Sequence, residues 1–412
     1  MSSLLIHNIG MLATPEGTEP RRGPDQGSIR VLEQAWIYTE NGEIISWGTG
    51  NPPITFGAKL DAGGRLVTPG LVDAHTHLIF GGWRQNELAM KLRNVPYLDI
   101  LAAGGGIHST VKATRAATEE ELTAKASAAL DEMLCFGTTS CEAKSGYGLC
   151  KKEELKQLKV IKRLNKEHPM DLAATFMGAH ALPPEYKDNR EGYLKLLCED
   201  MIPAAAKQKL AKFCDVFCET GVFTAEESRR ILQAGLDNGL IPKIHADEID
   251  PIGGSQLAGE IGAISAEHLI VCPDEGIESL ARGGTIACLL PATSFYLNST
   301  YAPARKMIEA GVPVALASDY NPGSCPCLNL QLVMNIACLK YRLTPEEVLT
   351  GVTLNAAAAM GMADRIGSID RAKQADLVIW EAPDLNYLCY RLGSNLAHTV
   401  IKKGEIVHGK AH

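Results

Sequence analysis

The chain has 412 residues, of which 46% are hydrophobic and 21% charged, as in an ordinary globular protein. Its formal net charge of −8 argues against nucleic-acid binding and provides no long-range attraction for an anion, so an anionic substrate would need a local Arg or Lys. The start, MSSLLIHNIGML, lacks a basic segment before a long apolar core, and no apolar run approaches the ~20 residues that span a bilayer. These features predict a cytoplasmic protein without a membrane segment.

The two ends of the chain contain short strand-like segments. Near the N-terminus, RVLEQAWIYTENGEIISWGTG contains Asn41-Gly42, a hairpin signal. Near the C-terminus, ADLVIWEAP and HTVIKKGEIVHG are also strand-like, and Lys403-Gly404 would form a turn. We expect residues 1–65 and 366–412 to pair into one small composite β-sandwich domain.

Between residues 66 and 365, short β-branched runs alternate with longer helical stretches, which is typical of βα units and a parallel sheet. Helix starts and ends are marked by two capping boxes, a Thr-Pro start and two glycines: Thr118 with Glu121, Thr224 with Glu227, Thr344-Pro345, Gly137 and Gly239. The eight strand runs are 67–75, 138–142, 171–180, 214–219, 241–247, 263–269, 285–291 and 313–319. Eight repeats predict an α/β fold, a (β/α)₈ TIM-like barrel over 66–365.

Polar side chains follow the carboxyl ends of four of these runs. The first run leads into DAHTH, and because positions two apart in a strand face the same side, His75 and His77 would project together. IPKIHADE supplies His245, AISAEHL supplies His268 and PVALASDYNPGS supplies Asp319. In a barrel of this type these ends meet at one rim, where reactive residues lie.

Three histidines and one aspartate can hold one divalent metal, leave a position open for water and lower the pKa of that water towards neutrality. Glu248 and His268 then remain as general acid or base groups. Each histidine by itself is compatible with a structural role, and Asp319 with capping the next helix. The convergence of four strand ends favours a metal site. We therefore expect the ligands to be His75, His77, His245 and Asp319.

The twelve cysteines are scattered through apolar segments without a small-domain framework. Two close pairs could bind metal, Cys214 with Cys218 and Cys325 with Cys327, but neither is accompanied by a second pair at finger-like spacing. We expect buried free thiols.

The stretches PGLVDAHTH, HADE, EHL and SDYNPG, together with the composite β domain, resemble the amidohydrolase superfamily over essentially the whole chain. Within it, the chain is most similar to the ring-opening hydrolases of histidine degradation. That more specific resemblance rests on FGGWRQNELAMKL (80–92), AAGGGIHSTV (102–111), EAKSGYGL (142–149), FMGAH (176–180), DVFCETGVF (215–223) and SDYNPGSCP (318–326).

The resemblance implies hydrolysis of 4-imidazolone-5-propanoate to N-formimidoyl-L-glutamate, one zinc or iron ion and a homodimer. It implies that Arg84 and Tyr147 bind the propanoate carboxylate or the ring and that His180 contacts the ring. The other side of the substrate would be lined by Asn321, Gly323 and Ser324. From the residues alone, less favoured alternatives stay open: a surface ion pair for Arg84, loop packing for Tyr147 and a structural strand end for His180.

In the mechanism that we expect, a metal-activated water attacks the ring carbonyl, which the metal or His180 polarises. His268 or Asp319 accepts the proton of the water, and Glu248 passes a proton to the departing ring nitrogen. Which residue carries which proton stays open at this point.

The chain departs from common superfamily patterns at two places. Glu219, and not a lysine that could be carboxylated, ends the fourth run, and Lys144 would belong to the loop after the second run. This favours one metal, although Glu219 could bridge a second. Lys373 and Gln374 stand where a glycine often precedes Ala-Asp, and we expect an effect on a surface turn only. The triple glycine at 104–106 suits a mobile lid or a tight turn.

Two other functions compete with this interpretation. A mononuclear cyclic deaminase acting on cytosine or a similar heterocycle would share the histidines, Glu248 and Asp319, but a neutral base would not need Arg84. A scaffold that had lost its metal would show gaps in the ligand set, and this sequence has none. Zinc and iron use the same nitrogen and oxygen ligands, so the sequence does not choose between them.

Overall fold

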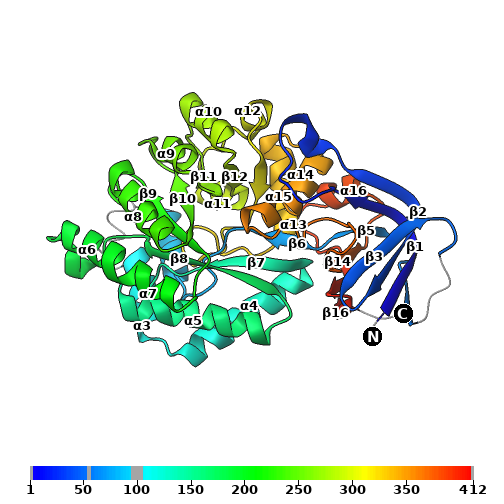
Figure 1. The fold of residues 1–412 in the computed structure, drawn as a ribbon, viewed down its shortest axis with the longest axis horizontal. Helices are drawn as coiled ribbons and strands as arrows, with labels where there is room; N and C mark the ends of the chain where they lie inside the picture. The colour runs from blue at the N-terminus through cyan, green and yellow to red at the C-terminus, as the bar shows by residue number, and fades with distance from the viewer. Residues whose placement is uncertain (1–2, 53–56, 94–104, 410–412) are drawn as a thin grey trace.

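The computed structural model describes residues 3–52, 57–93 and 105–409, and contains two sheets (Figure 1). The first, the barrel sheet, has eight strands, and each strand pairs in parallel with the next along the chain. Its strands are β6 (Leu71–Asp73), β7 (Thr138–Lys144), β8 (Asp171–Ala179), β9 (Phe213–Cys218), β10 (Ile241–Ala246), β11 (Ser265–His268), β12 (Ile286–Leu289) and β13 (Val314–Leu316). This is the expected TIM-like fold.

The sheet closes on itself through the residues that follow its first and last strands. Thr76 forms a parallel bridge with Tyr320, and the backbone N–H of Asp319 donates to the carbonyl of His75 over 3.0 Å. The N–H of Ser318 donates to the Asp73 carboxylate over 3.0 Å. Barrel closure therefore brings the segments that carry the predicted ligands of β6 and β13 into direct contact.

The helices surround this sheet (Figure 1). In chain order they are α1 (Leu88–Lys91), α3 (Ile107–Ala116), α4 (Glu119–Cys135), α5 (Lys151–Glu167), α6 (Arg190–Leu196), α7 (Ile202–Lys207), α8 (Ala225–Asp237), α9 (Gly254–Ile261), α10 (Asp274–Gly283), α11 (Pro291–Leu297), α12 (Ala304–Glu309), α13 (Leu330–Ile336), α14 (Pro345–Gly351), α15 (Leu354–Ala359) and α16 (Leu385–Tyr390). Short 3₁₀ turns are η1 (Gly23–Gly27), η2 (Gln85–Glu87) and η3 (Pro184–Tyr186), and two π-helical turns are η4 (Leu197–Met201) and η5 (Ala337–Tyr341).

The local helix signals act as the sequence predicts. Thr118 and Thr224 each complete a capping box that starts α4 and α8, and Thr344 does the same at α14. Gly137 and Gly239 follow the ends of α4 and α8 with φ of 93° and 77°, a left-handed backbone that glycine adopts without steric cost.

One predicted run, 67–75, is two strands. Residues 66–69 form β5 (Leu66–Pro69), which pairs with β1 and β14 in the second sheet, and the chain then enters the barrel as β6. His75 and His77 consequently lie beyond the barrel strand and not within it. Both still face the barrel interior, with ring centroids 5.3 Å apart. The single-strand interpretation of 67–75 was wrong, because Pro69-Gly70 separates the two strands.

The second sheet also has eight strands, which come from both ends of the chain in the order β16-β15-β14-β5-β1-β2-β3, with β4 paired to β1 (Figure 1). Its strands are β1 (Ser3–Thr14), β2 (Arg30–Glu40), β3 (Glu43–Thr49), β4 (Ala58–Asp61), β5, β14 (Leu377–Trp380), β15 (Ala397–Lys402) and β16 (Glu405–Gly409). Asn41-Gly42 and Lys403-Gly404 form the predicted hairpin turns, all four residues with positive φ. Division into domains at residues 65/66 and 365/366 stays a prediction.

Charged side chains join the second sheet to the barrel. Lys402 of β15 is buried, and its ammonium contacts Asp171 of β8 over 2.8 Å and Asp376 over 2.7 Å. Lys373 is also buried and donates to four oxygens, and Gln374 donates to Asp171 and Asp376. The expectation that positions 373 and 374 affect only a surface turn was therefore wrong.

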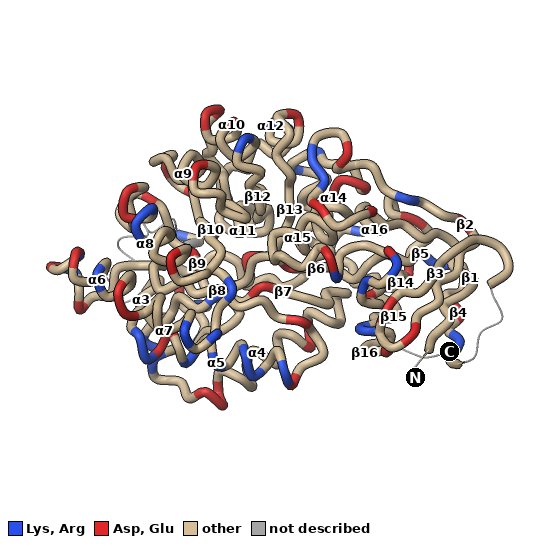
Figure 2. Tube along the Cα trace, viewed as in Figure 1, with Lys and Arg blue, Asp and Glu red and all other residues tan. Residues whose placement is uncertain are grey.

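The described part of the chain contains no helix that is long and apolar enough to cross a membrane. All twelve cysteines are free, and neither predicted cysteine pair belongs to a group of potential metal ligands among the described residues. Basic and acidic residues are interspersed along α4 and α5 (Figure 2). Of the triple glycine, Gly104 lies outside the described residues and Gly106 precedes α3 with a φ of 70°.

Candidate metal centre and active site

The four predicted metal ligands converge inside the rim of the barrel. All are buried, and they come from the segment after β6, from β10 and from the segment after β13. The Oδ1 atom of Asp319 lies 3.4 Å from Nε2 of His75 and 3.6 Å from Nε2 of His77. Nε2 of His245 lies 3.4 Å from Nε2 of His77. One point in space is thus faced by three imidazole nitrogens and one carboxylate oxygen.

The chemistry of this donor set fits a divalent cation. Nε2 of His75 and Oδ1 of Asp319 are buried and have no hydrogen-bond partner, an arrangement that costs free energy unless something positive lies between them. Three nitrogens and one oxygen suit zinc or iron. His75 also forms a second group with Glu267 and Cys288, but the Lys243 ammonium, 3.3 Å from Glu267, disfavours a cation there.

Two buried carboxylates orient two of these imidazoles. Nδ1 of His245 donates to Oδ1 of Asp215 over 3.1 Å, and Nδ1 of His75 donates to Oε2 of Glu267 over 2.9 Å. A carboxylate only accepts, so both hydrogens are on Nδ1 and both Nε2 atoms present a lone pair to the centre. Burial by itself would raise the pKa of Glu267, but nearby Lys243 and Lys144 lower it to about 2. The sequence interpretation missed both carboxylates, although acidic residues inside otherwise apolar strands were a signal.

The two predicted proton-transfer residues lie together at the same rim. Oε2 of Glu248 is 3.6 Å from Nε2 of His268. Burial raises the pKa of Glu248 to about 7, and burial lowers the pKa of His268 to about 4. His268 and Asp319 both adopt positive φ, 69° and 56°, in a region that non-glycine residues rarely occupy outside constrained sites. The carboxyl of Glu248 is thus able to exchange a proton near neutral pH.

Glu219 does not reach the metal donors. Its carboxylate accepts the N–H groups of Thr220, Ile249 and Asp250, so it fastens the loop that follows β10. Lys144 is the last residue of β7 and is fully buried in the barrel, so its assignment to a loop was wrong.

His180 and Tyr147 border the donor set on one side. The ring of His180 stacks on that of His77, with centroids 4.8 Å apart, and the Tyr147 ring lies 5.2 Å from His180. Nδ1 of His180 donates to the carbonyl of Gly146 over 3.1 Å. Burial is the main cause that lowers the pKa of His180 to about 3. The ring is therefore neutral, and its Nε2 is a hydrogen-bond acceptor.

The loop that carries Tyr147 is held by a residue that the sequence interpretation missed. The buried carboxylate of Glu154 accepts the backbone N–H groups of Gly146, Gly148 and Leu149 at 2.7–2.9 Å. Three such bonds on one carboxylate fix the loop in the conformation that places Tyr147 beside the histidines.

Arg84 lies against the predicted Asn-Pro-Gly-Ser turn. The side chain of Asn321 accepts the N–H groups of Gly323 and Ser324 at 2.8 and 2.7 Å and donates to the carbonyl of Asp319, which ties the turn to the donor set. The guanidinium covers Gly323 so closely that a Cβ there would be 0.9 Å from Nη2 of Arg84. Nε of Arg84 is buried without a hydrogen-bond partner. Its Nε is 3.9 Å from Oε2 of Glu87, which is beyond hydrogen-bond distance, so the guanidinium can also contact an anionic group near the centre.

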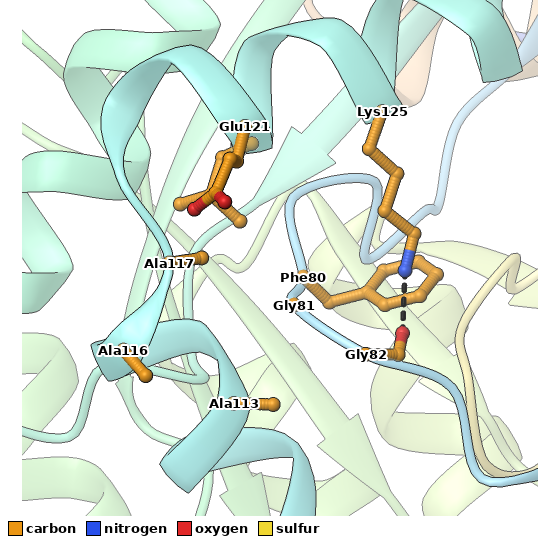
Figure 3. A pocket seen from close by; sticks show the side chains of 9 residues that line it. Phe80, Gly81, Gly82, Ala113, Ala116, Ala117, Glu121 and Lys125 are labelled. Atoms are coloured by element: carbon orange, nitrogen blue, oxygen red, sulfur yellow. Dashed lines mark hydrogen bonds between the residues drawn. The ribbon is translucent and has the colours of Figure 1, made fainter.

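The segment before Arg84 is fastened to the helices outside the barrel. Figure 3 shows Lys125 of α4 reaching over this segment. Its ammonium lies 3.7 Å from the centroid of the Phe80 ring and donates to the carbonyl of Gly82. Thr114 of α3 accepts the N–H of Gly81 over 2.9 Å. These contacts fix the path of the chain towards Arg84.

Comparison with known proteins agrees with this geometry. The model of the amidohydrolase family matches residues 66–407. The structure is similar to that of an adenosine deaminase from Xanthomonas campestris with bound zinc, with a TM-score of 0.70, 20% sequence identity, and coverage of 100% of this chain and 94% of that one. The chain belongs to the amidohydrolase family.

Within that family the chain groups with the imidazolonepropionases. The imidazolonepropionase of Alkaliphilus metalliredigens (strain QYMF) is 51% identical over 417 residues, covering 100% of this chain and 99% of the relative. That of Treponema denticola is 54% identical over 380 residues, covering 91% and 92%. Similarity of this degree over the full length separates the chain from the deaminase, which shares only the fold.

Proposed function

We propose that this enzyme hydrolyses 4-imidazolone-5-propanoate to N-formimidoyl-L-glutamate, a reaction of histidine degradation. The observation that carries the proposal is the largely buried Arg84 guanidinium, which lies on the turn that follows Asp319 and whose Nε is 3.9 Å from the carboxylate of Glu87. A cation in that position suits a substrate that has a carboxylate at a fixed distance from the bond to be cleaved. Full-length imidazolonepropionase relatives support the same assignment.

One divalent ion, zinc or iron, would be held by His75, His77, His245 and Asp319. When bound, such an ion supplies Lewis acidity and makes water a nucleophile near neutral pH. Because Glu219 is engaged with backbone N–H groups, a single ion is favoured over a pair.

The substrate would lie between two groups of side chains. Arg84 would bind the propanoate carboxylate, with Tyr147 against the ring or its tail. His180, neutral and with Nδ1–H engaged by Gly146, would accept the N–H of the ring through Nε2, so we assign it to ring orientation in place of carbonyl polarisation. The opposite wall would be formed by Asn321, Gly323 and Ser324.

Ring opening consumes one water. Its oxygen bonds to the ring carbonyl carbon, the bond from that carbon to the ring nitrogen breaks, and the nitrogen takes up a proton. Glu248, with its pKa near 7, would deliver this proton, and His268 or Asp319 would receive the proton that the water releases. The former carbonyl carbon thereby becomes a carboxylate of N-formimidoyl-glutamate, and the released ring nitrogen becomes its formimidoyl nitrogen.

The alternative function is that of a mononuclear cyclic deaminase, because the fold is shared with such an enzyme. The two differ in their need for Arg84. Replacement of Arg84 by alanine should raise KM for the imidazolone acid at least tenfold, and an unchanged KM would remove the carboxylate assignment.

The direct test follows the ultraviolet absorbance of freshly prepared 4-imidazolone-5-propanoate with purified enzyme, with and without a strong chelator, against the spontaneous decay of the substrate. We expect fast, chelator-sensitive loss that yields N-formimidoyl-glutamate. No turnover by protein shown to hold metal would contradict the substrate assignment, and ammonia release from heterocycles would then be measured. We further propose that the enzyme is a cytoplasmic homodimer. It would bind its small-molecule substrate and would not bind nucleic acid or membranes.

A further inference from the structure

The barrel interior next to the candidate metal centre contains five charged side chains that are fully buried. They are two lysines and three carboxylates from four adjacent or facing strands: Glu142 and Lys144 of β7, Asp215 of β9, Lys243 of β10 and Glu267 of β11. A charge in a protein interior is costly unless partners compensate it, so the arrangement of these five groups calls for a physical reason.

Lys144 connects to one of the ligand histidines through a single carboxylate. Its ammonium donates to Oδ2 of Asp215 over 2.8 Å, and Oδ1 of the same carboxylate accepts from Nδ1 of His245 over 3.1 Å. The ammonium also donates to Glu142 over 2.9 Å. Each oxygen of Asp215 thus has its own partner, and rotation of the carboxylate would break both contacts.

Lys243 repeats this arrangement at a second ligand histidine. Its ammonium lies 3.3 Å from Oε1 of Glu267, while Oε2 of Glu267 accepts from Nδ1 of His75 over 2.9 Å. The same ammonium is 3.3 Å from Oε1 of Glu142. Glu142 therefore contacts both lysines and links the two lysine–carboxylate–histidine chains.

We propose that Lys144 and Lys243 are positioning residues for the metal centre. Each fixes one carboxylate, and through it the ring orientation and the Nδ1–H tautomer of one ligand, His245 and His75 respectively. The inference rests on the proposed metal centre and not on the identity of the substrate.

The formal charges agree with this role. Two ammoniums and three carboxylates leave one negative charge in the network, and Asp319 adds a second. A divalent cation at the donor set balances both. Loss of one lysine would leave its carboxylate without a partner, free to turn away from the imidazole, and the imidazole could then present a protonated Nε2 to the site.

A matched control exists at the other end of the barrel. Lys402 is also buried and also bridges two carboxylates, Asp171 and Asp376, but neither of these contacts a ligand histidine. If the interior lysines serve only to neutralise charge during folding, replacement of Lys144 and of Lys402 should have the same consequences.

The test compares K144M, K243M and K402M in the full-length protein. Zinc affinity is measured by competition with a chromophoric chelator, and the thermal unfolding midpoint is measured on metal-free protein. We expect K144M to lower zinc affinity about 10- to 100-fold and K243M to lower it less, because its contacts are longer. K402M should lower the midpoint and leave the affinity within about twofold of wild type. Wild-type affinity in K144M and K243M would overturn the proposal.

A second measurement uses only wild-type protein and so does not depend on whether the variants fold. In metal-free wild-type protein labelled with ¹⁵N at histidine, NMR should detect a fixed Nδ1–H tautomer at His180, whose Nδ1–H donates to Gly146, and also at the two imidazoles that test the proposal, His75 and His245. Rapid tautomer exchange at both would contradict the proposal. Neither measurement uses substrate, so an absence of turnover would refute the proposed function and leave this inference to be judged separately.

Discussion

Replacement of Gly323 by alanine tests whether Arg84 binds the carboxylate of the substrate. The backbone of Gly323 is not in the left-handed region, so alanine is tolerated there and the effect is purely steric. The new Cβ would lie 0.9 Å from Nη2 and 2.1 Å from Cζ of Arg84. An ordinary contact needs at least 3.4 Å, so the guanidinium must move by about 2.5 Å.

A displacement of this size exceeds the tolerance of a hydrogen bond, whose donor–acceptor distance varies by only about 0.5 Å. Loss of a charge-assisted contact costs about 1.5–3 kcal/mol, which corresponds to a roughly 10- to 150-fold increase in KM. Arg84 contacts the unreactive tail in the proposed complex, so kcat should change much less than KM. Steady-state kinetics on the imidazolone acid measures both constants.

Two controls make this result decisive. In G27A the new Cβ lies 3.4 Å from Cγ of Glu347, an ordinary contact far from the turn, and kinetics should match wild type. The metal content of G323A should also be unchanged, because a fall would mean that the turn had pulled Asp319 away from the donor set. An unchanged KM in metal-loaded G323A would refute the assignment of Arg84.

Three further outcomes are expected. E248Q should bind metal normally but lose about 10²-fold or more in kcat. In the wild type we expect activity to decline above pH 7 as the Glu248 carboxyl loses its proton, and this decline should be absent from the pH profile of E248Q. If E248Q keeps the decline, another group delivers that proton. A chelator should abolish activity and lower the thermal unfolding midpoint. A divalent metal at 100 times its Kd should then restore about 2.7 kcal/mol of unfolding free energy. An unchanged midpoint after chelation would argue against a buried metal site. D171N should lose about 1–3 kcal/mol of unfolding free energy in urea at pH 7. Burial alone would raise the pKa of Asp171, but Lys402 holds this pKa below its ordinary value. The stabilisation is therefore complete above pH ~4 and is lost in more acidic solution. If D171N lost the same unfolding free energy at pH 3 as at pH 7, the ion pair would be contradicted.

Local signals in the sequence were sufficient for most of the architecture. Capping boxes depend on residues three apart, and the Asn41-Gly42 turn depends on two residues that adopt positive φ, so no distant contact is needed to predict them. The boundary between β5 and β6 was missed for the opposite reason. Pro69-Gly70 lies inside one apolar run, and only the pairing of β5 with β1 and β14 assigns residues 66–69 to the second sheet.

The convergence of the four proposed ligands could be predicted because barrel topology brings strand ends to one rim. The orientation of those ligands could not. Asp215 and Glu267 lie one or more residues inside their strands, and a lone charge in such a run is as compatible with an exposed face as with a buried one. Glu154 was missed similarly, since its three backbone partners belong to a loop whose conformation exists only in the folded chain.

The buried lysines also support the proposal that this barrel holds a single ion. A carboxylated lysine at the fourth strand would bring a second ion to the rim, but here that strand instead contributes Asp215, which is held between the Lys144 ammonium and the His245 ring. An ammonium 2.8 Å from that carboxylate disfavours a second cation on the same side. In this proposal the interior charges limit the number of bound ions as well as orient the histidines. Removal of Lys144 should therefore weaken metal binding at the proposed centre and should not by itself create a second metal site.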